Sequence, residues 1–209
     1  MQKTIYIVRH GETELNKNRI IQGSGIDAPL NATGHKQAKA FHQRYADRGF
    51  DVVLTSALKR THETMAPFID QGLPWEQFPE INEMGWGIYE GKPSSAEMKA
   101  VYKTMLDAWK SGDYEAHIPG GESAQQLADR LFIFVEHLKQ RPEENILVCS
   151  HGRAMRCLMT LLRRQELSEM DQYHHSNTGL YLVDYQPDEF VFQLENDLAH
   201  LEGLYPKKA

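Results

Sequence analysis

The chain has 209 residues, an apolar share of 41% and a formal net charge of −6 at pH 7. This length and apolar share permit a sizeable core and are ordinary for a globular protein. The acidic balance argues against a general nucleic-acid binder, although a local cationic pocket needs only a few arginines.

Cysteine usage and the lack of long apolar runs indicate the compartment. Cys149 and Cys157 are the only cysteines, and they match neither a disulfide framework nor the spacing of a zinc site. We expect buried free thiols in a reducing compartment. No stretch is long and apolar enough to span a membrane, and the N-terminal apolar run is too short for a signal peptide. The sequence therefore predicts a cytoplasmic protein without a membrane partner.

The first third of the chain alternates strand and helix patterns. The β-branched and aromatic run TIYIV at 4–8 predicts a buried strand. A polar, glycine-bearing stretch at 15–30 predicts a long loop, and residues 31–47 predict a helix that ends before a glycine. We expect a second short strand at 51–55 and a helix over 57–69.

The middle of the chain is less regular. A third strand is expected at 75–78, and the glycine-bearing stretch at 79–93 predicts irregular structure. Ser94 or Ser95 can cap a helix that continues to about residue 109. The long loop at 15–30, not this stretch, is the segment whose length is typical of a functional loop.

The last third returns to alternation and closes with a hairpin. Residues 122–140 have apolar side chains in helical register. The apolar run at 146–150 predicts another buried strand, and 152–162 a helix after it. Two final strands are expected at 180–185 and 190–194, joined by a Gln-Pro-Asp turn.

This order of elements predicts an α/β fold. Strands that alternate with helices form a mainly parallel sheet with helices on both faces, which is a three-layer α/β/α sandwich. The final hairpin is expected to add an antiparallel edge strand. The chain contains no repeat, low-complexity tract or linker, so we expect residues 1–209 to form a single domain.

Three of the predicted strands end in residues suited to anion chemistry. Arg9 and His10 follow the first strand. Ser56 follows the second, with Arg60 close behind, and His151 follows the fourth. Parallel strands place all of these residues at one edge of the sheet, where ligands bind in open α/β folds. We therefore expect His10 and His151 to be neighbours in space.

The residue types at this edge predict an anion site that contains a nucleophile. Neutral histidine can attack phosphorus, and Arg9 and Arg60 can hold phosphoryl oxygens bidentately. His151 can donate a further hydrogen bond as charge spreads over those oxygens. Gly11 allows the backbone to approach the anion closely.

The chain resembles the histidine phosphatases, the phosphoglycerate-mutase-like superfamily. The resemblance covers most of the chain, because the motifs that carry it run from residue 9 to residue 152 in the order of the family. They are RHGETE at 9–14 with Asn16, Gln22-Gly23, DAPLNATGHKQA at 27–38, TSALKRTHET at 55–64, INEMGWGIYEG at 81–91, PGGES at 119–123 and ILVCSHG at 146–152.

The resemblance implies a phosphoglycerate-mutase-like fold and a role for each site residue. His10 would be the nucleophile that becomes phosphohistidine, and Glu83 would protonate the leaving group. An alkoxide is a poor leaving group near neutral pH, so the chemistry needs such an acid, and the same carboxylate can then activate water. No metal and no cofactor is implied, since arginines carry the charge. The phosphoryl group would be bound by Arg9, Arg60 and His151, with Asn16, Gln22 and Gly23 lining the pocket.

Other polar residues near the motifs have alternative explanations. Glu80 and Glu90 compete with Glu83 as the acid, and only the resemblance favours Glu83. Asn177 and Thr178 precede a late strand, where the family often has polar groups close to the site. His174 and His175 have no third ligand at the spacing of a metal site. The alternatives for His62 are the pocket wall or the helix surface, and those for Arg153 and Arg156 are contact with a substrate tail or the surface. Surface positions are expected for these three residues and for the remaining histidines, which are His35, His42, His117, His137 and His200.

The predicted activity is phosphomonoester hydrolysis. Mutases of the family usually carry a longer insertion after the acid, with a Glu-Arg-His-Tyr-Gly pattern, and a tail that shields phosphohistidine from water. Here the segment 91–119 is compact, that pattern is absent and the C-terminal end at 204–209 is short. The alternatives are a cofactor-dependent phosphoglycerate mutase and a non-catalytic phosphate-binding protein. Replacement of a site residue would favour the binding protein, and none is replaced.

The expected substrate is a small phosphorylated metabolite, either α-ribazole phosphate-like or one of a broad range of esters. Met84, Trp86, Ile88 and Tyr89 predict an apolar rim for an aromatic or bulky leaving group. Leu15 stands where the family often has an aromatic residue, which weakens any single substrate assignment. No nucleic-acid partner is expected, and the sequence leaves the oligomeric state open, a homodimer included.

Overall fold

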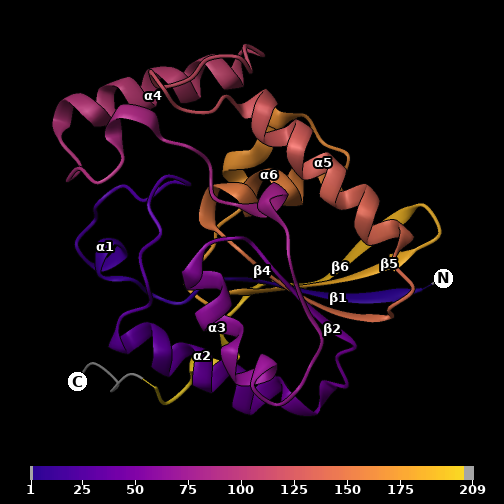
Figure 1. Cartoon of the computed structure of the whole chain (residues 1–209). Coiled ribbons are helices and arrows are strands. Elements are labelled where there is room, and N and C mark those ends of the chain that lie inside the picture. The colour runs from indigo at the N-terminus through magenta and orange to yellow at the C-terminus, as the bar shows by residue number, and fades with distance from the viewer. Residues whose placement is uncertain (1, 205–209) are drawn as a thin grey trace.

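A six-stranded sheet crosses the molecule in the strand order β3-β2-β4-β1-β5-β6 (Figure 1). The structure is a computed structural model that describes residues 2–204. β1 to β4 pair in parallel, while β5 runs antiparallel to β1 and β6 antiparallel to β5. The predicted parallel sheet with an antiparallel edge is confirmed. The strands are β1 Lys3–Arg9, β2 Val52–Thr55, β3 Trp75–Gln77, β4 Asn145–Ser150, β5 Leu180–Gln186 and β6 Glu189–Asp197.

Helices cover both faces of this sheet, as the three-layer prediction requires. Figure 1 shows α5 and α6 on one face and α2 and α3 on the other. The α-helices are α1 Glu14–Lys17, α2 Ala32–Tyr45, α3 Lys59–Ile69, α4 Ala96–Lys110, α5 Ala124–Gln140 and α6 Gly152–Leu162. Short 3₁₀-helices lie at Ala46–Arg48, Pro79–Ile81, Gly87–Tyr89, Leu167–Gln172 and Ala199–Leu201.

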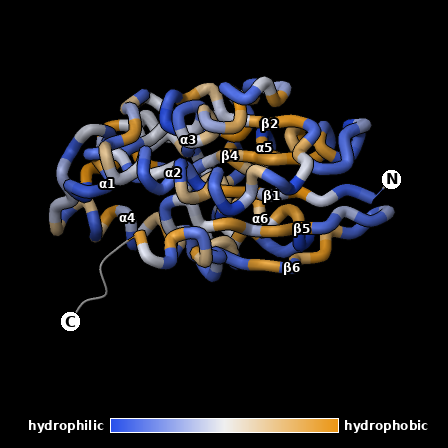
Figure 2. Tube along the Cα trace, turned by 90° about the horizontal axis from the view of Figure 1, so that it is seen from below, coloured by the Kyte–Doolittle hydropathy of each residue, from blue (hydrophilic) through white to orange (hydrophobic). Residues whose placement is uncertain are grey.

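The side chains of β1 explain why both faces are covered. Ile5 and Ile7 pack into the core beneath α5 and α6, whereas Tyr6 and Val8 pack against α2 and α3. Successive side chains of a strand point to opposite faces, so a strand that is buried on both sides has a continuous apolar sequence. Figure 2 shows this apolar character along β1, β2 and β4 in the middle of the molecule.

Two stretches that the sequence predicts as irregular contain short helices. The loop prediction at 15–30 is wrong at its start, where α1 forms. Thr13 caps α1, since its hydroxyl accepts Asn16 N–H at 3.1 Å while the Asn16 side chain accepts Thr13 N–H at 3.3 Å. A single turn has no periodicity, so only this reciprocal cap could have indicated the helix. The stretch 79–93 likewise contains two of the 3₁₀-helices.

Helix α4 lies away from the sheet, at the upper left of Figure 1. Ser95 is its N-cap, with Oγ accepting Met98 N–H at 3.1 Å. Only Met98, Met105 and Trp109 are buried in this helix, so much of α4 faces solvent. None of the helices formed by residues 2–204 combines the length and the apolar run that a membrane span needs.

The first turn of α2 packs directly against the loop that follows β1. A Cβ at Gly34 would lie 2.2 Å from the carbonyl oxygen of Glu12, and a Cβ at Gly11 would lie 2.8 Å from that of Gly34. Gly11 is therefore required by this close approach of helix and loop, a reason additional to the approach to an anion expected from the sequence.

This contact predicts a reversed effect for an ordinary helix substitution. Alanine is normally more stable than glycine inside a helix by about 0.5–1 kcal/mol. Gly34→Ala should instead lower the free energy of unfolding by about 1–3 kcal/mol, because backbone must move to admit the methyl group. Urea denaturation measures this, and Thr33→Ala on the same turn should stay within about 0.5 kcal/mol of the parent. A more stable Gly34→Ala variant would contradict the close packing.

Candidate active site

The register of the sheet brings the ends of three strands together. Arg9 pairs with Ser150 across β1 and β4, and Thr55 of β2 pairs with Cys149 of β4. The residues that follow these ends therefore meet, and the rings of His10 and His151 lie 5.1 Å apart between centroids. The predicted proximity of the two histidines is confirmed.

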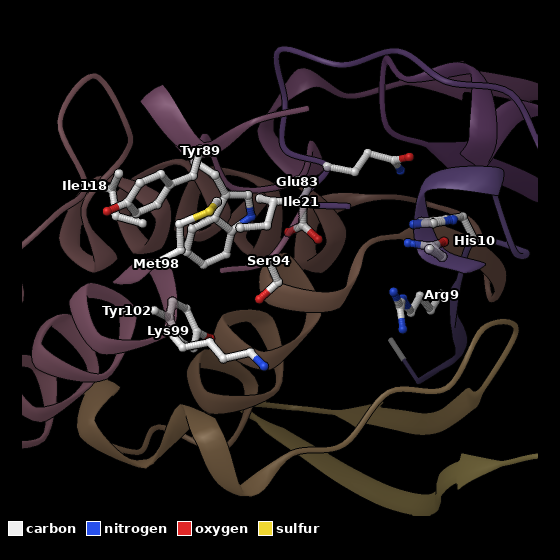
Figure 3. A pocket seen from close by; sticks show the side chains of 13 residues that line it. Arg9, His10, Ile21, Glu83, Tyr89, Ser94, Met98, Lys99, Tyr102 and Ile118 are labelled. Atoms are coloured by element: carbon white, nitrogen blue, oxygen red, sulfur yellow. The ribbon is translucent and has the colours of Figure 1, made fainter. Parts of the chain in front are cut away.

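A cavity of about 430 Å³ opens at this edge and has two chemically different ends (Figure 3). Figure 3 shows Arg9 and His10 at one end, Tyr89, Met98 and Ile118 at the other, and Glu83 between them. The polar end is lined by Arg9, His10, Asn16, Gln22 and Glu83. The remainder is lined by Ile21, Trp86, Tyr89, Ser94, Met98, Lys99, Tyr102 and Ile118.

His10 is held as a neutral imidazole with one fixed tautomer. It is only 2% exposed, and Nδ1 lies 2.7 Å from the carbonyl oxygen of Gly11, so Nδ1 carries the proton and donates it there. Burial lowers the pKa of His10 well below its usual value, and the charges of Arg60 and Arg9 lower it further. Nε2 is therefore unprotonated, which a nucleophilic nitrogen requires.

Arg9 lies beside His10 over the start of α6. One of its terminal nitrogens donates to the carbonyl oxygen of His175 at 2.8 Å, while Nε has no hydrogen-bond partner within the described residues. The guanidinium packs over Gly152, where a Cβ would lie 3.5 Å from this Nε, an ordinary van der Waals contact. The fork of Arg9 is thus anchored at one point and keeps donors for an anion.

Arg60 lies behind the cavity and is fully buried. Its Nε donates to His151 Nδ1 at 3.1 Å, and its other nitrogens donate to the carbonyl oxygens of Ile26 at 2.8 Å and Gly23 at 3.3 Å. Burial lowers the pKa of Arg60 to about 10, although Glu83 opposes the shift. The guanidinium stays charged near neutral pH and ties the 23–26 loop to His151.

Both ring nitrogens of His151 have partners. Because the guanidinium of Arg60 can only donate, Nδ1 of His151 accepts, and the proton lies on Nε2, which donates to Ser56 Oγ at 2.8 Å. Burial lowers the pKa of His151 well below its usual value, with Arg60 adding to the effect. His151 can donate to a phosphoryl group only if its ring exchanges the Ser56 contact for the ligand.

Glu83 occupies the start of α6 and is 7% exposed. His151 is the N-cap of this helix but makes no side-chain cap hydrogen bond. The carboxylate of Glu83 takes that place, since Oε1 accepts the N–H groups of Met84 at 2.9 Å, Arg153 at 3.1 Å and Ala154 at 3.0 Å. The unpaired amides of a helix N-terminus suit a carboxylate.

The competing carboxylates lie elsewhere in the described structure. Glu90 Oε1 accepts Trp86 N–H at 2.9 Å, and neither Glu80 nor Glu90 lines the cavity. Arg130 of α5 holds the chain around Glu83, donating to the carbonyl oxygens of Asn82 at 2.9 Å and Glu83 at 3.2 Å. Geometry therefore favours Glu83 among the three, which spacing alone could not do.

Asn16 and Gln22 line the cavity, whereas Gly23 lies at its back. Thr13 Oγ1 donates to Gln22 Oε1 at 3.0 Å, so the amide nitrogen of Gln22 remains for a ligand. Gly23 accepts from Arg60 through its carbonyl oxygen, and a Cβ there would lie 2.0 Å from Glu90 Oε1. Its lack of a side chain therefore serves the packing of Glu90.

Asn177 and Thr178 stand directly behind His10. The amide nitrogen of Asn177 donates to the carbonyl oxygen of His10 at 2.9 Å, and Thr178 N–H donates to that of Arg9 at 3.0 Å. Thr178 has a positive φ of 56°, and its hydroxyl lies 2.9 Å from Nε2 of the buried His200. This turn fixes the backbone that presents both site residues.

The comparisons with known proteins decide the family. The sequence model of the histidine phosphatase superfamily, branch 1, matches residues 5–198. The chain belongs to this superfamily. The resemblance inferred from the motifs is thereby confirmed, together with the phosphoglycerate-mutase-like fold that it implies.

Similar members of the superfamily carry different names. A protein of Yersinia enterocolitica named "Probable phosphoglycerate mutase GpmB" is 32% identical in an alignment that covers 95% of this chain and 94% of that protein. A protein of Hydrogenobacter thermophilus named as a candidate phosphoserine phosphatase 2 is 26% identical over 97% of this chain and 99% of that one. The crystal structure of the α-ribazole phosphatase from Shigella flexneri is 27% identical, with a TM-score of 0.81 over 93% of this chain and 96% of that one.

Several surface predictions are wrong in this superfamily member. Arg153 is buried and pairs with Asp171 at 2.7 Å, and Arg156 is half-buried and pairs with the same carboxylate at 2.9 Å. His200 is buried against Phe41 and Thr178, and burial lowers its pKa to about 4. Arg153 and Arg156 are charged residues within the largely apolar helix α6, and His200 lies in a short 3₁₀-helix, so residue type and period did not indicate the burial of these side chains. His42, His62 and His137 are half-buried, whereas His35 and His117 are exposed as predicted.

Two of the four residues predicted to form an apolar rim line the cavity. Trp86 and Tyr89 line the cavity, but Met84 lies fully buried in the core and Ile88 is 51% exposed. The sequence analysis missed the contribution of α4, which supplies Met98, Lys99 and Tyr102. Their spacing on one helix face was a usable signal. Only the tertiary fold, however, shows that this face meets the cavity.

No group of three or more His, Cys, Asp or Glu side chains in residues 2–204 is arranged to hold a metal ion. The C-terminal tail on which the open-site expectation rests lies, from residue 205 on, outside the described residues.

Because His10 and His151 are buried as neutral imidazoles, we expect acid to destabilise the fold. Their pKa values are lowered in the folded chain, so the unfolded chain binds more protons below about pH 6.5. The free energy of unfolding should then fall with pH from about 6.5 downward, by up to about 1.4 kcal/mol per pH unit for each of His10 and His151. Urea denaturation between pH 7.5 and 5.5 measures the slope. His151→Gln should show a shallower slope and His35→Gln, at an exposed position, the parental one; equal slopes in all three would contradict neutral burial.

Proposed function

We propose that the chain is a phosphomonoester hydrolase that acts through a phosphohistidine at His10. The observation that supports this most strongly is the state of His10: neutral, with Nδ1 donating to Gly11 and Nε2 unprotonated, in a cavity shared with Arg9 and Glu83. The membership of the histidine phosphatase superfamily supports the same reading.

In the first step, Nε2 of His10 attacks phosphorus and the bond to the ester oxygen breaks. Arg9 and Arg60 supply positive charge for the phosphoryl oxygens, and His151 holds Arg60 in place by accepting a hydrogen bond from its Nε. Glu83 gives its proton to the departing oxygen, so the leaving group departs as an alcohol. Asn16 and Gln22 hold the bound phosphoryl group from the remaining side.

In the second step, water replaces the alcohol. Glu83, now a carboxylate, takes a proton from water as the water oxygen attacks the phosphohistidine. The bond between phosphorus and Nε2 breaks, inorganic phosphate leaves and neutral His10 is restored. The two arginines provide the charge stabilisation that metal ions provide in other phosphoryl-transfer enzymes, so we propose that hydrolysis requires no metal and no cofactor.

The proposed substrate is a small phosphorylated metabolite that a cytoplasmic enzyme would encounter. The likeness to an α-ribazole phosphatase and the apolar end of the cavity support an ester with a bulky leaving group. One catalytic domain formed by residues 1–209 suffices for this activity.

A cofactor-dependent phosphoglycerate mutase is the second candidate function. The 32% identity to a protein named as a phosphoglycerate mutase favours it. A mutase would return the phosphoryl group of His10 to a second hydroxyl of the substrate rather than to water. The two activities therefore share His10 and differ in the acceptor of the second step.

A direct test is hydrolysis of 4-nitrophenyl phosphate by the purified protein in the presence of a chelator. We expect turnover that does not change when chelator replaces added magnesium, together with release of phosphate from a panel of metabolite esters. Conversion of 3-phosphoglycerate with a 2,3-bisphosphoglycerate primer, faster than any phosphate release, would instead establish the mutase. Turnover that appears only with added metal would contradict the metal-free mechanism.

A further inference from the structure

The apolar end of the cavity is closed by one face of α4. Met98, Lys99 and Tyr102 lie within one turn of this helix and line the cavity, with Ser94 just before its N-cap. Figure 3 shows the side chain of Lys99 extending along the cavity, with its ammonium group directed towards the space between the aromatic end and Arg9. A cation thus stands where the leaving group of a bound ester would lie.

The wall behind this cation is aromatic. The rings of Trp86 and Tyr102 lie 5.6 Å apart between centroids and are tilted by 58° to each other. The guanidinium of Arg153 lies 6.0 Å from the ring of Trp86 and 5.5 Å from that of Trp109, and it also bonds to the hydroxyl of Tyr102. Aromatic faces fixed by a buried cation favour a planar apolar group packed against them.

Lys99 is the cation at this end that is left for a ligand. Arg153 is already engaged, since it pairs with Asp171 at 2.7 Å and with Tyr102. Lys103, one turn further along α4, pairs with Asp107 at 2.5 Å. Lys99 forms no ion pair within residues 2–204. Its charge is therefore not compensated by the protein.

The other charged residues that line the cavity also leave Lys99 free to bind an anion. Glu83 is the one carboxylate among the described lining residues, and it accepts amide N–H groups at the start of α6 rather than an ion pair from Lys99. Arg9 stands at the opposite end, beside His10. A phosphoryl group bound at Arg9 would neutralise the charge of Arg9. Lys99 would then face the part of the leaving group that lies furthest from phosphorus.

We propose that Lys99 selects esters whose leaving group carries a second anionic group, attached to a flat apolar body. The body would pack against Trp86 and Tyr102, and the anion would lie at the Lys99 ammonium. This inference rests on the proposed hydrolase function and names the class of its substrate: a planar or bulky phosphate monoester with a remote carboxylate or second phosphate.

The test compares phenyl phosphate with 4-carboxyphenyl phosphate. The preference is the ratio of kcat/KM for the charged ester to that for the neutral one, measured for the parent protein, Lys99→Met, Lys99→Arg and the control Lys103→Met. Dividing the ratio of each variant by that of the parent cancels the different reactivities of the two esters.

The preference should fall about three- to tenfold in Lys99→Met at low ionic strength, the range of a partly exposed charge pair. It should be retained in Lys99→Arg and in Lys103→Met, and added salt should reduce it in the parent protein. An unchanged ratio in Lys99→Met, with both esters still hydrolysed, would overturn the inference while leaving the hydrolase function intact. If the parent protein hydrolysed neither ester, both the inference about Lys99 and the proposed hydrolase function would be overturned.

Discussion

Replacing His10 by alanine is expected to lower kcat for phosphate esters by at least about 10,000-fold, because the nucleophile of a covalent mechanism cannot be replaced by its neighbours. His151 cannot take over the attack, since Arg60 occupies its Nδ1 and Ser56 its Nε2. Steady-state hydrolysis of 4-nitrophenyl phosphate measures the loss, with thermal unfolding of the variant as the check on its fold.

His35→Ala is the matched control for this experiment. His35 is an exposed histidine on α2, and its removal leaves the cavity untouched. We expect parental turnover from this variant. Retention of more than about one per cent of activity by His10→Ala, on the scale of other nucleophile removals, would refute the assignment of His10.

Replacing Glu83 by glutamine is expected to separate alkyl from aryl esters. Glutamine can still accept amide hydrogen bonds through its carbonyl oxygen, so the start of α6 should remain capped. It cannot give up a proton to a leaving alkoxide. The first-step rate for an alkyl ester should fall about 100- to 10,000-fold, whereas 4-nitrophenolate leaves without protonation and its rate should fall less than about tenfold.

The measurement is the single-turnover release of the alcohol, because Glu83 also serves the later attack of water and would slow both esters in the steady state. Glu90→Gln is the control, since Glu90 bonds to the backbone of Trp86 and lies outside the cavity lining. Equal losses on both esters in the first step would count against Glu83 as the acid.

The layers of the fold could be predicted because β1, β2 and β4 are buried on both faces. The alternation of Ile5 and Ile7 with Tyr6 and Val8 is visible as a continuous apolar run, and each such run is followed by a helix pattern. The proximity of His10 and His151 followed from one topological rule, that parallel strands end at the same edge. The register of β1 and β4 fulfils that rule.

Contacts between distant segments could not be predicted in this way. The buried position of Arg153 depends on Asp171 and on the aromatic rings of α4, and that of His200 depends on Thr178 and Phe41. These partners are not related by any period in the sequence. The same holds for the hydrogen bond between Arg60 and His151, two fully buried residues that lie behind the cavity and are not among the residues that line it.

The packing reasons for two glycine positions also became visible only in the structure. Gly11 is needed where α2 approaches the loop after β1, and Gly23 is needed beside the carboxylate of Glu90. The sequence analysis predicts close approach of the Gly11 backbone to an anion, and the structure adds a close approach to protein at both glycines.

The most direct test of the phosphohistidine mechanism is to quench the enzyme within a single turnover of a ³²P-labelled ester and locate the label. The mechanism predicts one phosphoryl group per chain, labile in acid and stable in alkali as expected for a phosphorus–nitrogen bond, on Nε2 of His10. Label on any other residue, or release of one equivalent of alcohol with no label on the protein at any time, would contradict it.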